Sequence, residues 1–267
     1  MPFLERDGFS LYYEIHGQGH PLVLIRGLGS NLEHWYEQVP VFSREYKVIV
    51  LNNRGIGQSG DPGGHLTIKA MAEDVAALID DAGGGRAHVL GISMGGMIAQ
   101  ELALGWPETV AGLVLTATHC GGGHKVLPTA ETMELFAKLM TGKDFAEQME
   151  GRKALFARET LQNRSDILER YAQVAAACEP PPEVMKRQWL AIQEFDAYER
   201  LPQITAPTLV LAGADDLLVP LGNAELLARR VPDARLCVIP KAGHQLVIEQ
   251  PRATNAAVLE FLAPLSG

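Results

Sequence analysis

The segment that most constrains the fold is Gly91-Ile92-Ser93-Met94-Gly95, which joins an apolar run to a stretch of helical character. His88–Leu90 has the composition of a buried strand, and Gly96–Ala103 has that of a helix. A strand, a tight G-x-S-x-G turn and a helix are typical of a turn that lifts a serine hydroxyl above a sheet. We therefore predict that Ser93 is a nucleophile held over a helix N-terminus, where free N–H groups suit an oxyanion. The alternative is an ordinary glycine-rich turn.

Short apolar strands alternate with helices along most of the chain. This alternation predicts an α/β fold with a mostly parallel central sheet flanked by helices. The expected strands are Leu11–Ile15, Pro21–Ile25, Lys47–Leu51, Ala87–Leu90, Gly112–Ala117, Pro207–Ala212 and Ala234–Ile239, and the expected helices are Thr67–Ala82, Met94–Leu104, Gly222–Val231 and Arg252–Leu262.

The alternation stops between the strands near residues 117 and 207. The segment between them consists mostly of helix formers, so we expect a core of residues 1–120 and 205–267 and a helical lid of residues 121–204. Its methionine and aromatic side chains either line an adaptable apolar pocket or pack the lid onto the core. Trp189 is a candidate substrate-binding residue. The expected lid helices are Pro128–Met140, Asp144–Leu155, Asp166–Cys178 and Glu183–Tyr198.

A serine hydroxyl is a weak nucleophile and needs a base that a carboxylate orients. Asp215 and Asp216 follow the expected strand Pro207–Ala212, and we favour Asp216 as the orienting acid. His244 lies in the loop after the last expected strand and is the candidate base. The chain order Ser, Asp, His is the order used when the serine sits on a strand–turn–helix elbow. Leu218, just after the acidic pair, is a second candidate substrate-binding residue.

An oxyanion hole needs two N–H donors aimed at one point. The N–H of Met94 follows from the turn around Ser93. The loop Arg26–Ser30, after the second expected strand, contains two glycines that allow close backbone approach, and the N–H of Leu28 is its best candidate. We expect Trp35 to pack beneath this loop.

These stretches resemble the α/β-hydrolase fold superfamily, in its serine esterase and 3-oxoadipate enol-lactonase-like branch. The resemblance covers nearly the whole chain. It implies a helical lid and cofactor-free acyl transfer, and its usual spacing of the acid from a preceding Gly and a following Pro supports Asp216. The matching residues are Leu51–Ser59, Gly91–Gly96, Gly213–Asp216 with Pro220, and Gly243-His244 with Glu249-Gln250-Pro251.

Two residues depart from the family pattern. Arg26 precedes Gly27 where relatives usually carry His, and Asn52 stands where relatives often carry Asp. Arg26 either pairs with a local carboxylate or reaches a carboxylate or carbonyl of the substrate. Asn52 has no charge, so a charge pair between it and Arg26 is excluded.

The composition of the chain limits which classes of molecule it can bind. The net charge of −9 and pI near 5.4 argue against nucleic acid and against anionic membrane surfaces. Three cysteines without tight spacing, no signal-like N-terminus and no apolar run long enough for a bilayer predict a cytoplasmic protein without a disulfide framework. A homodimer is compatible with the sequence.

Two further patterns are only weak evidence for a nucleotide site or a metal site. Gly55–Gly60 matches G-x-G-x-x-G, but Asp61-Pro62-Gly63-Gly64 extends a loop where a nucleotide site needs a helix. His119–His124 lacks a second pair of metal ligands, so we expect neither a metal nor a cofactor.

The leading hypothesis is a serine hydrolase acting on small or medium carboxylic esters through an acyl-enzyme. Opening of an enol-lactone, hydrolysis of a carbon–carbon bond and cofactor-free haloperoxidase or perhydrolase chemistry use the same three residues and stay open. A hypothesis of another class is a non-catalytic receptor that senses a small ligand.

Overall fold

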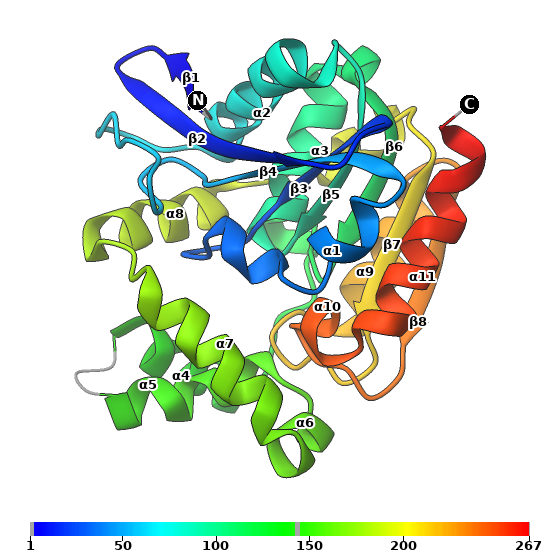
Figure 1. Cartoon of the computed structure of the whole chain (residues 1–267). Helices are drawn as coiled ribbons and strands as arrows, with labels where there is room; N and C mark the ends of the chain where they lie inside the picture. Colours follow the sequence, from blue (N-terminus) through cyan, green and yellow to red (C-terminus); the bar gives the residue numbers. More distant parts are fainter. Residues whose placement is uncertain (1–2, 142–144, 267) are drawn as a thin grey trace.

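The computed structural model describes residues 3–141 and 145–266. Its centre is an eight-stranded sheet in the order β1-β2-β4-β3-β5-β6-β7-β8 (Figure 1). The pairs β1–β2 and β2–β4 are antiparallel, and every pair from β4–β3 onward is parallel. The strands are β1 (Phe3–Arg6), β2 (Phe9–His16), β3 (His20–Ile25), β4 (Tyr46–Leu51), β5 (Ala87–Ile92), β6 (Val110–Thr116), β7 (Thr208–Gly213) and β8 (Ala234–Ile239).

Helices cover both faces of this sheet, as Figure 1 shows. The α-helices are α1 (Val39–Phe42), α2 (Ile68–Gly83), α3 (Met94–Gly105), α4 (Ala130–Thr141), α5 (Phe145–Gly151), α6 (Arg158–Asn163), α7 (Ser165–Ala177), α8 (Pro182–Glu194), α9 (Leu221–Arg230), α10 (Leu246–Glu249) and α11 (Pro251–Leu262). Short 3-10 helices are η1 (Leu32–Trp35), η2 (Pro107–Thr109), η3 (Gly122–His124), η4 (Arg152–Leu155), η5 (Tyr198–Gln203) and η6 (Ala263–Leu265).

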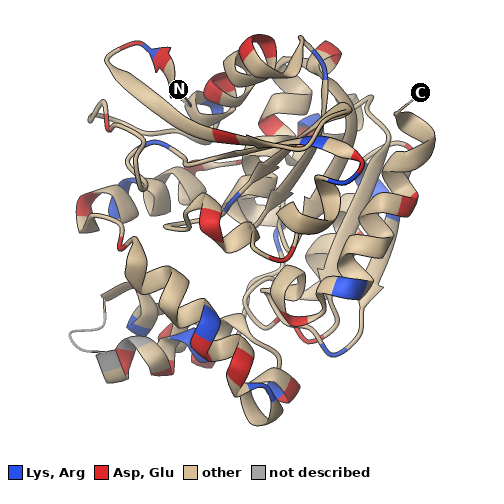
Figure 2. Cartoon of the chain, in the orientation of Figure 1, with Lys and Arg blue, Asp and Glu red and all other residues tan. Residues whose placement is uncertain are grey.

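The core is split into two layers by the side-chain alternation of the strands. In β3, Val23 and Ile25 pack with α2 and α3, while Leu22 and Leu24 pack with the residues of α10 and α11. The central strands β3, β5, β6 and β7 contain no Asp, Glu, Lys or Arg, and Figure 2 shows the charges on the surrounding helices and loops. Strands buried on both faces are typical of parallel sheets, which explains these continuous apolar runs.

The predicted fold class is confirmed: an eight-stranded, mostly parallel sheet is flanked by helices. Every predicted strand is present, with ends shifted by a few residues. The N-terminal strand β1 was not predicted, because its side chains alternate only between exposed and half-buried positions at the sheet edge. The predicted start of α2 is also found, where the Thr67 hydroxyl accepts the N–H of Ala70 at 3.0 Å.

The described residues between β6 and β7 form helices and one isolated bridge, which pairs Gly121 with Asp196. Helices lie in each predicted helical region, and α6 is an additional one that no pattern indicated. Of the predicted helix Asp144–Leu155, Asp144 lies outside the described residues. The boundaries of the core and of the lid stay predictions.

Buried His88 and half-buried His20 lie together at the amino-terminal edge of the parallel strands. The rings of His20 and His88 lie 4.3 Å apart, and Nε2 of His88 lies 3.0 Å from the hydroxyl of Ser266. Burial lowers the pKa of His88 to about 4, with the charges of His20 and Arg86 acting in the same direction. The folded protein therefore holds His88 neutral.

We expect this burial to make folding sensitive to acid. An unfolded histidine titrates near pH 6.5, so the stability from neutral His88 is present above that pH and is lost as the pH falls toward 4. His88→Gln removes the titrating group, and the loss of unfolding free energy between pH 7.5 and pH 5 should shrink by up to about 2 kcal/mol. Urea unfolding at both pH values measures this difference, and equal losses in the variant and the parent would contradict it.

Candidate active site

Ser93 occupies a strained turn between β5 and α3. Its φ of 57° and ψ of −122° lie in a region that non-glycine residues rarely adopt. Its N–H donates to the carbonyl of Thr116 at 2.9 Å, and its carbonyl accepts the hydroxyl of Thr118 at 2.8 Å. These two bonds to the end of β6 hold the strained conformation in place.

The glycines on either side of Ser93 are required by close packing. A Cβ at Gly91 would lie 2.1 Å from the carbonyl oxygen of Gly95, and a Cβ at Gly95 would lie 2.2 Å from the carbonyl oxygen of Ile25. Both distances are far below van der Waals contact. The G-x-S-x-G pattern therefore describes a turn in which α3 starts directly against the end of β3.

His244 and Asp216 form a buried pair after β8 and β7. Nδ1 of His244 lies 3.0 Å from Oδ2 of Asp216, and neither residue is more than 6% exposed. Oδ1 of Asp216 accepts the N–H groups of Leu218 at 2.9 Å and Val219 at 2.8 Å. An acceptor-only carboxylate makes Nδ1 the donor and leaves Nε2 of His244 as the basic nitrogen.

Asp215, the other acid of the predicted pair, is exposed. Its backbone N–H donates to the carbonyl of Ala242 at 2.9 Å, which anchors the turn. The structure thus brings Asp216, and not Asp215, to His244.

The loop after β3 brings backbone donors to Ser93. A Cβ at Gly27 would lie only 3.4 Å from Oγ of Ser93, so the loop runs directly beside the hydroxyl. Met94 is the first residue of α3, where an N–H has no partner within the helix. The N–H of Leu28 donates no hydrogen bond within residues 3–141 and 145–266. Two N–H groups are therefore available at this end of the sheet.

Glu249 connects the histidine loop to the segment between β6 and β7. Its Oε1 accepts the N–H of Gly243 at 2.8 Å, and its Oε2 accepts the N–H of Ala157 at 2.8 Å and the hydroxyl of Thr160 at 2.6 Å. Burial raises the pKa of Glu249, while these hydrogen bonds oppose the rise. No role was predicted for Glu249 from the sequence, although its position five residues after His244 was a usable signal.

Arg26 lies at the end of β3 and is only 1% exposed. Its guanidinium carbon is 4.8 Å from the centre of the Trp35 ring, as expected for a tryptophan beneath this loop, and Nη2 donates to Oε1 of Gln245 at 3.1 Å. The alternative of a local ion pair is wrong for the described part of the chain, in which no carboxylate pairs with Arg26. Asn52 instead accepts the N–H of Leu32 at 2.8 Å.

The other two candidate substrate-binding residues lie on different sides of the site. Trp189 of α8 is half-buried, with its ring 5.5 Å from that of Phe136 in α4. Leu218 is half-buried beside Asp216 and packs with the core layer of α10 and α11. Their roles toward a substrate stay predictions.

The sequence pattern at Gly55–Gly60 forms a loop, and the next helix, α2, begins at Ile68. In residues 3–141 and 145–266, no cluster of three or more His, Cys, Asp or Glu side chains has the arrangement of a metal site. His124, one of the weak metal candidates, stacks on Tyr198 with ring centres 3.6 Å apart.

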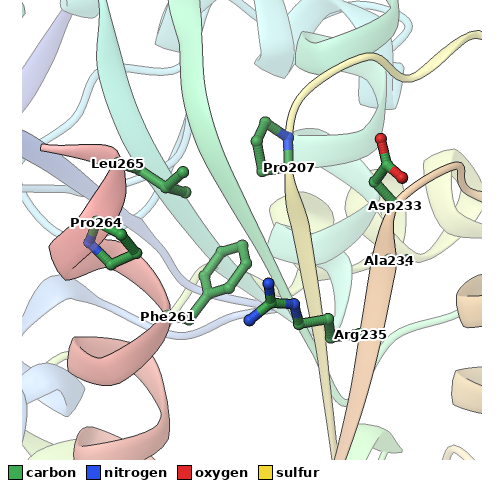
Figure 3. Close-up of a pocket in the computed structure, with 7 residues that line it drawn as sticks. All are labelled: Pro207, Asp233, Ala234, Arg235, Phe261, Pro264 and Leu265. Carbon is green, nitrogen blue, oxygen red and sulfur yellow. The ribbon is translucent and has the colours of Figure 1, made fainter.

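A cavity of about 430 Å³ lies at the opposite end of the sheet from Ser93 (Figure 3). Its lining includes Asp233 and Ala234 at the start of β8 and Phe261 of α11. Because Ser93 follows the carboxyl end of β5, this cavity plays no part in the site around Ser93.

A sequence model of the alpha/beta hydrolase fold matches residues 20–251. The chain belongs to the α/β-hydrolase family.

Relatives of this α/β hydrolase are similar over their full lengths. The chain is 32% identical to a protein of Azorhizobium caulinodans named as the carbamate hydrolase RutD, and the match covers 98% of each chain. Among solved structures, a thermophilic esterase from Thermogutta terrifontis superposes with a TM-score of 0.83 at 29% identity, covering 97% of this chain and 95% of the esterase. The enol-lactonase of Burkholderia xenovorans superposes with a TM-score of 0.84 at 25% identity, and the match covers 98% of this chain and 100% of the enol-lactonase.

The α/β hydrolase contains, among the residues that the structure describes, no helix with the length and hydrophobicity needed to span a bilayer.

We expect Glu249→Gln to weaken both stability and turnover. An amide places N–H donors against backbone N–H groups or the Thr160 hydroxyl, so at least one hydrogen bond to Glu249 is lost. A drop of about 1–3 kcal/mol in unfolding free energy should follow. Because the Gly243 contact positions the loop of His244, kcat should fall more than KM changes.

Glu260→Gln is the matched control, because it is the same substitution at an exposed position on α11. Urea unfolding and steady-state kinetics compare the two variants. A Glu249→Gln protein as stable and active as the Glu260→Gln protein would refute this role.

Proposed function

We propose that this α/β hydrolase cleaves small or medium carboxylic esters through a covalent acyl-enzyme on Ser93. The observation that carries the proposal is the buried pair of His244 and Asp216 at the same edge of the sheet as the strained Ser93 turn. This arrangement supports a nucleophile, a base and an orienting acid in their required order. The similarity to an esterase and to an enol-lactonase supports the same class of bond.

In the proposed mechanism, Ser93 attacks the acyl carbon while Nε2 of His244 takes the proton from its hydroxyl. Asp216 holds the imidazole through Nδ1 and stabilises the imidazolium that forms. The N–H groups of Leu28 and Met94 stabilise the oxyanion of the tetrahedral intermediate. His244 then gives its proton to the leaving alkoxide and activates the water that releases the acid.

The segment of residues 121–204 is proposed to act as a lid. Gln188 of α8 accepts the N–H of Gly29 in the oxyanion loop at 2.9 Å, and the carbonyl of Leu155 accepts the N–H of Gln245 at 3.1 Å. The segment therefore contacts the loops on both sides of Ser93. A lid in this position excludes water from the acyl-enzyme and shapes the acyl pocket.

The same residues support related reactions, which differ in the bond cleaved. Lactones, carbamates and vinylogous acids present an electrophilic carbonyl to Ser93 in the same way, and hydrogen peroxide can replace water in the second step. A substrate panel of short esters, lactones, carbamates and vinylogous acids, with and without hydrogen peroxide, separates these reactions, and a purely ligand-sensing receptor would turn over none of them.

We expect Ser93→Ala to abolish hydrolysis of p-nitrophenyl acetate and butyrate while leaving the fold intact. Without the nucleophile, kcat should fall by about 10⁴-fold or more. Replacing Ser93 by Ala keeps the Cβ, so the turn retains its packing and circular dichroism should be unchanged. Steady-state release of p-nitrophenol measures the effect, and undiminished turnover in a folded variant would exclude the mechanism.

A further inference from the structure

Arg26 is a buried cation whose charge is not balanced by any carboxylate in the described part of the chain. Only Nη2 of its guanidinium has a partner, the neutral side-chain oxygen of Gln245, while Nε and Nη1 are buried without one. Burial lowers the pKa of Arg26 to about 10, so the group stays protonated at neutral pH. A buried charge without a partner destabilises a fold.

The groups around Arg26 are also polar, and several of their buried atoms have no hydrogen-bond partner in the described part of the chain. Three buried donors in η1 and its flanks make no hydrogen bond in the described structure. They are the side-chain N–H groups at Nδ2 of Asn31 and Nε1 of Trp35, and the hydroxyl of Tyr36. His34 donates from Nδ1 to Oδ1 of Asn31 at 2.7 Å. Burial, followed by the charge of Arg26, lowers the pKa of His34 to about 3, so this neighbour brings no second charge.

The potential at this position is positive. Burial raises the pKa of Tyr171 on α7, and the charges of Arg26 and of Arg152 in η4 oppose that rise, so both cations lie close to the same ring. The acid on the outer side, Glu37, is paired with Arg170 at 2.8 Å. An anion beside Arg26 would meet unpaired donors and two cations, together with the unpaired Nε2 of neutral His34.

Arg26 also lies beside the reacting groups. Gly27, the next residue, packs against Oγ of Ser93, and Gln245, the partner of Arg26, follows His244 directly. The Arg26–Gln245 hydrogen bond therefore joins the loop beside Ser93 to the loop of His244.

We propose that Arg26 binds a carboxylate on the acyl part of the substrate, so that the enzyme's preferred substrates are half-esters of dicarboxylic acids. This inference rests on the proposed serine hydrolase function. A carboxylate at Nε or Nη1 supplies the counter-charge that the protein omits, and charge-assisted hydrogen bonds in a buried site are strong and directional. The free enzyme keeps Arg26 unpaired, and the substrate pairs it.

The test compares charged and uncharged esters of equal length. The p-nitrophenyl half-esters of succinate, glutarate and adipate are measured beside the same compounds with the second carboxyl group methylated. The parent enzyme should favour the charged ester at one or more of these lengths by at least tenfold in kcat/KM. In Arg26→Met, kcat/KM should fall at least tenfold for the charged ester and less than threefold for its methylated partner.

Two further variants serve as controls. Arg26→Lys keeps a charge and should retain part of the preference, whereas Arg229→Met removes a charge from the exposed face of α9 and should behave like the parent. Arg26→Met should also melt at the same temperature or higher, because it removes an unpaired buried charge. Equal losses on charged and methylated esters, or no preference in the parent at any length, would overturn the inference.

A binding experiment separates this inference from the proposed function. Titration calorimetry of succinate, glutarate and adipate into Ser93→Ala should detect binding of at least one dicarboxylate, and the added Arg26→Met change should remove it. Binding of this kind without hydrolysis of any ester would refute the hydrolase and keep the carboxylate site. Hydrolysis of esters without any dependence on Arg26 would keep the hydrolase and refute the site.

Discussion

The structure depends on the contact between the start of α3 and the end of β3. Gly95 packs its backbone against the carbonyl of Ile25 at a distance that no side chain would allow, and Ser93, two residues earlier in the same turn, adopts a positive φ. The chain then continues from Ile25 into Arg26 and Gly27, so the same contact sets the loop after β3 beside the serine. Ser93, the two candidate N–H donors and Arg26 therefore share one point of backbone packing.

The histidine side of the site is held by a different device, a buried carboxylate with three donors. Glu249 bonds the loop of His244 and the segment containing Ala157 and Thr160 at the same time. A buried carboxylate is tolerated because each oxygen accepts hydrogen bonds. As a result, a movement of the α6 region would be transmitted to the loop that carries His244, the proposed base.

The sequence predicted what local patterns encode. Apolar runs marked the parallel strands, the threonine cap marked the start of α2, and the turn around Ser93 marked its strained conformation. It did not predict β1, whose half-exposed side chains give no apolar run, or α6, which is six residues long. Arg26 shows a further limit: its motif departure was visible, but the absence of a nearby carboxylate depends on residues far apart in the chain.

Backbone atoms and side chains contribute differently to this site. The turn, the N–H groups and the loop positions come from packing that any relative with the same glycines can reproduce. Arg26 is different, because a guanidinium with two unpaired nitrogens in a buried position lowers stability unless something binds it. A group of this kind persists where a ligand supplies the missing charge, since the free energy lost in the empty protein is regained when the charge is paired. On the proposal made above, this unpaired guanidinium is the feature of the site that distinguishes one substrate from another.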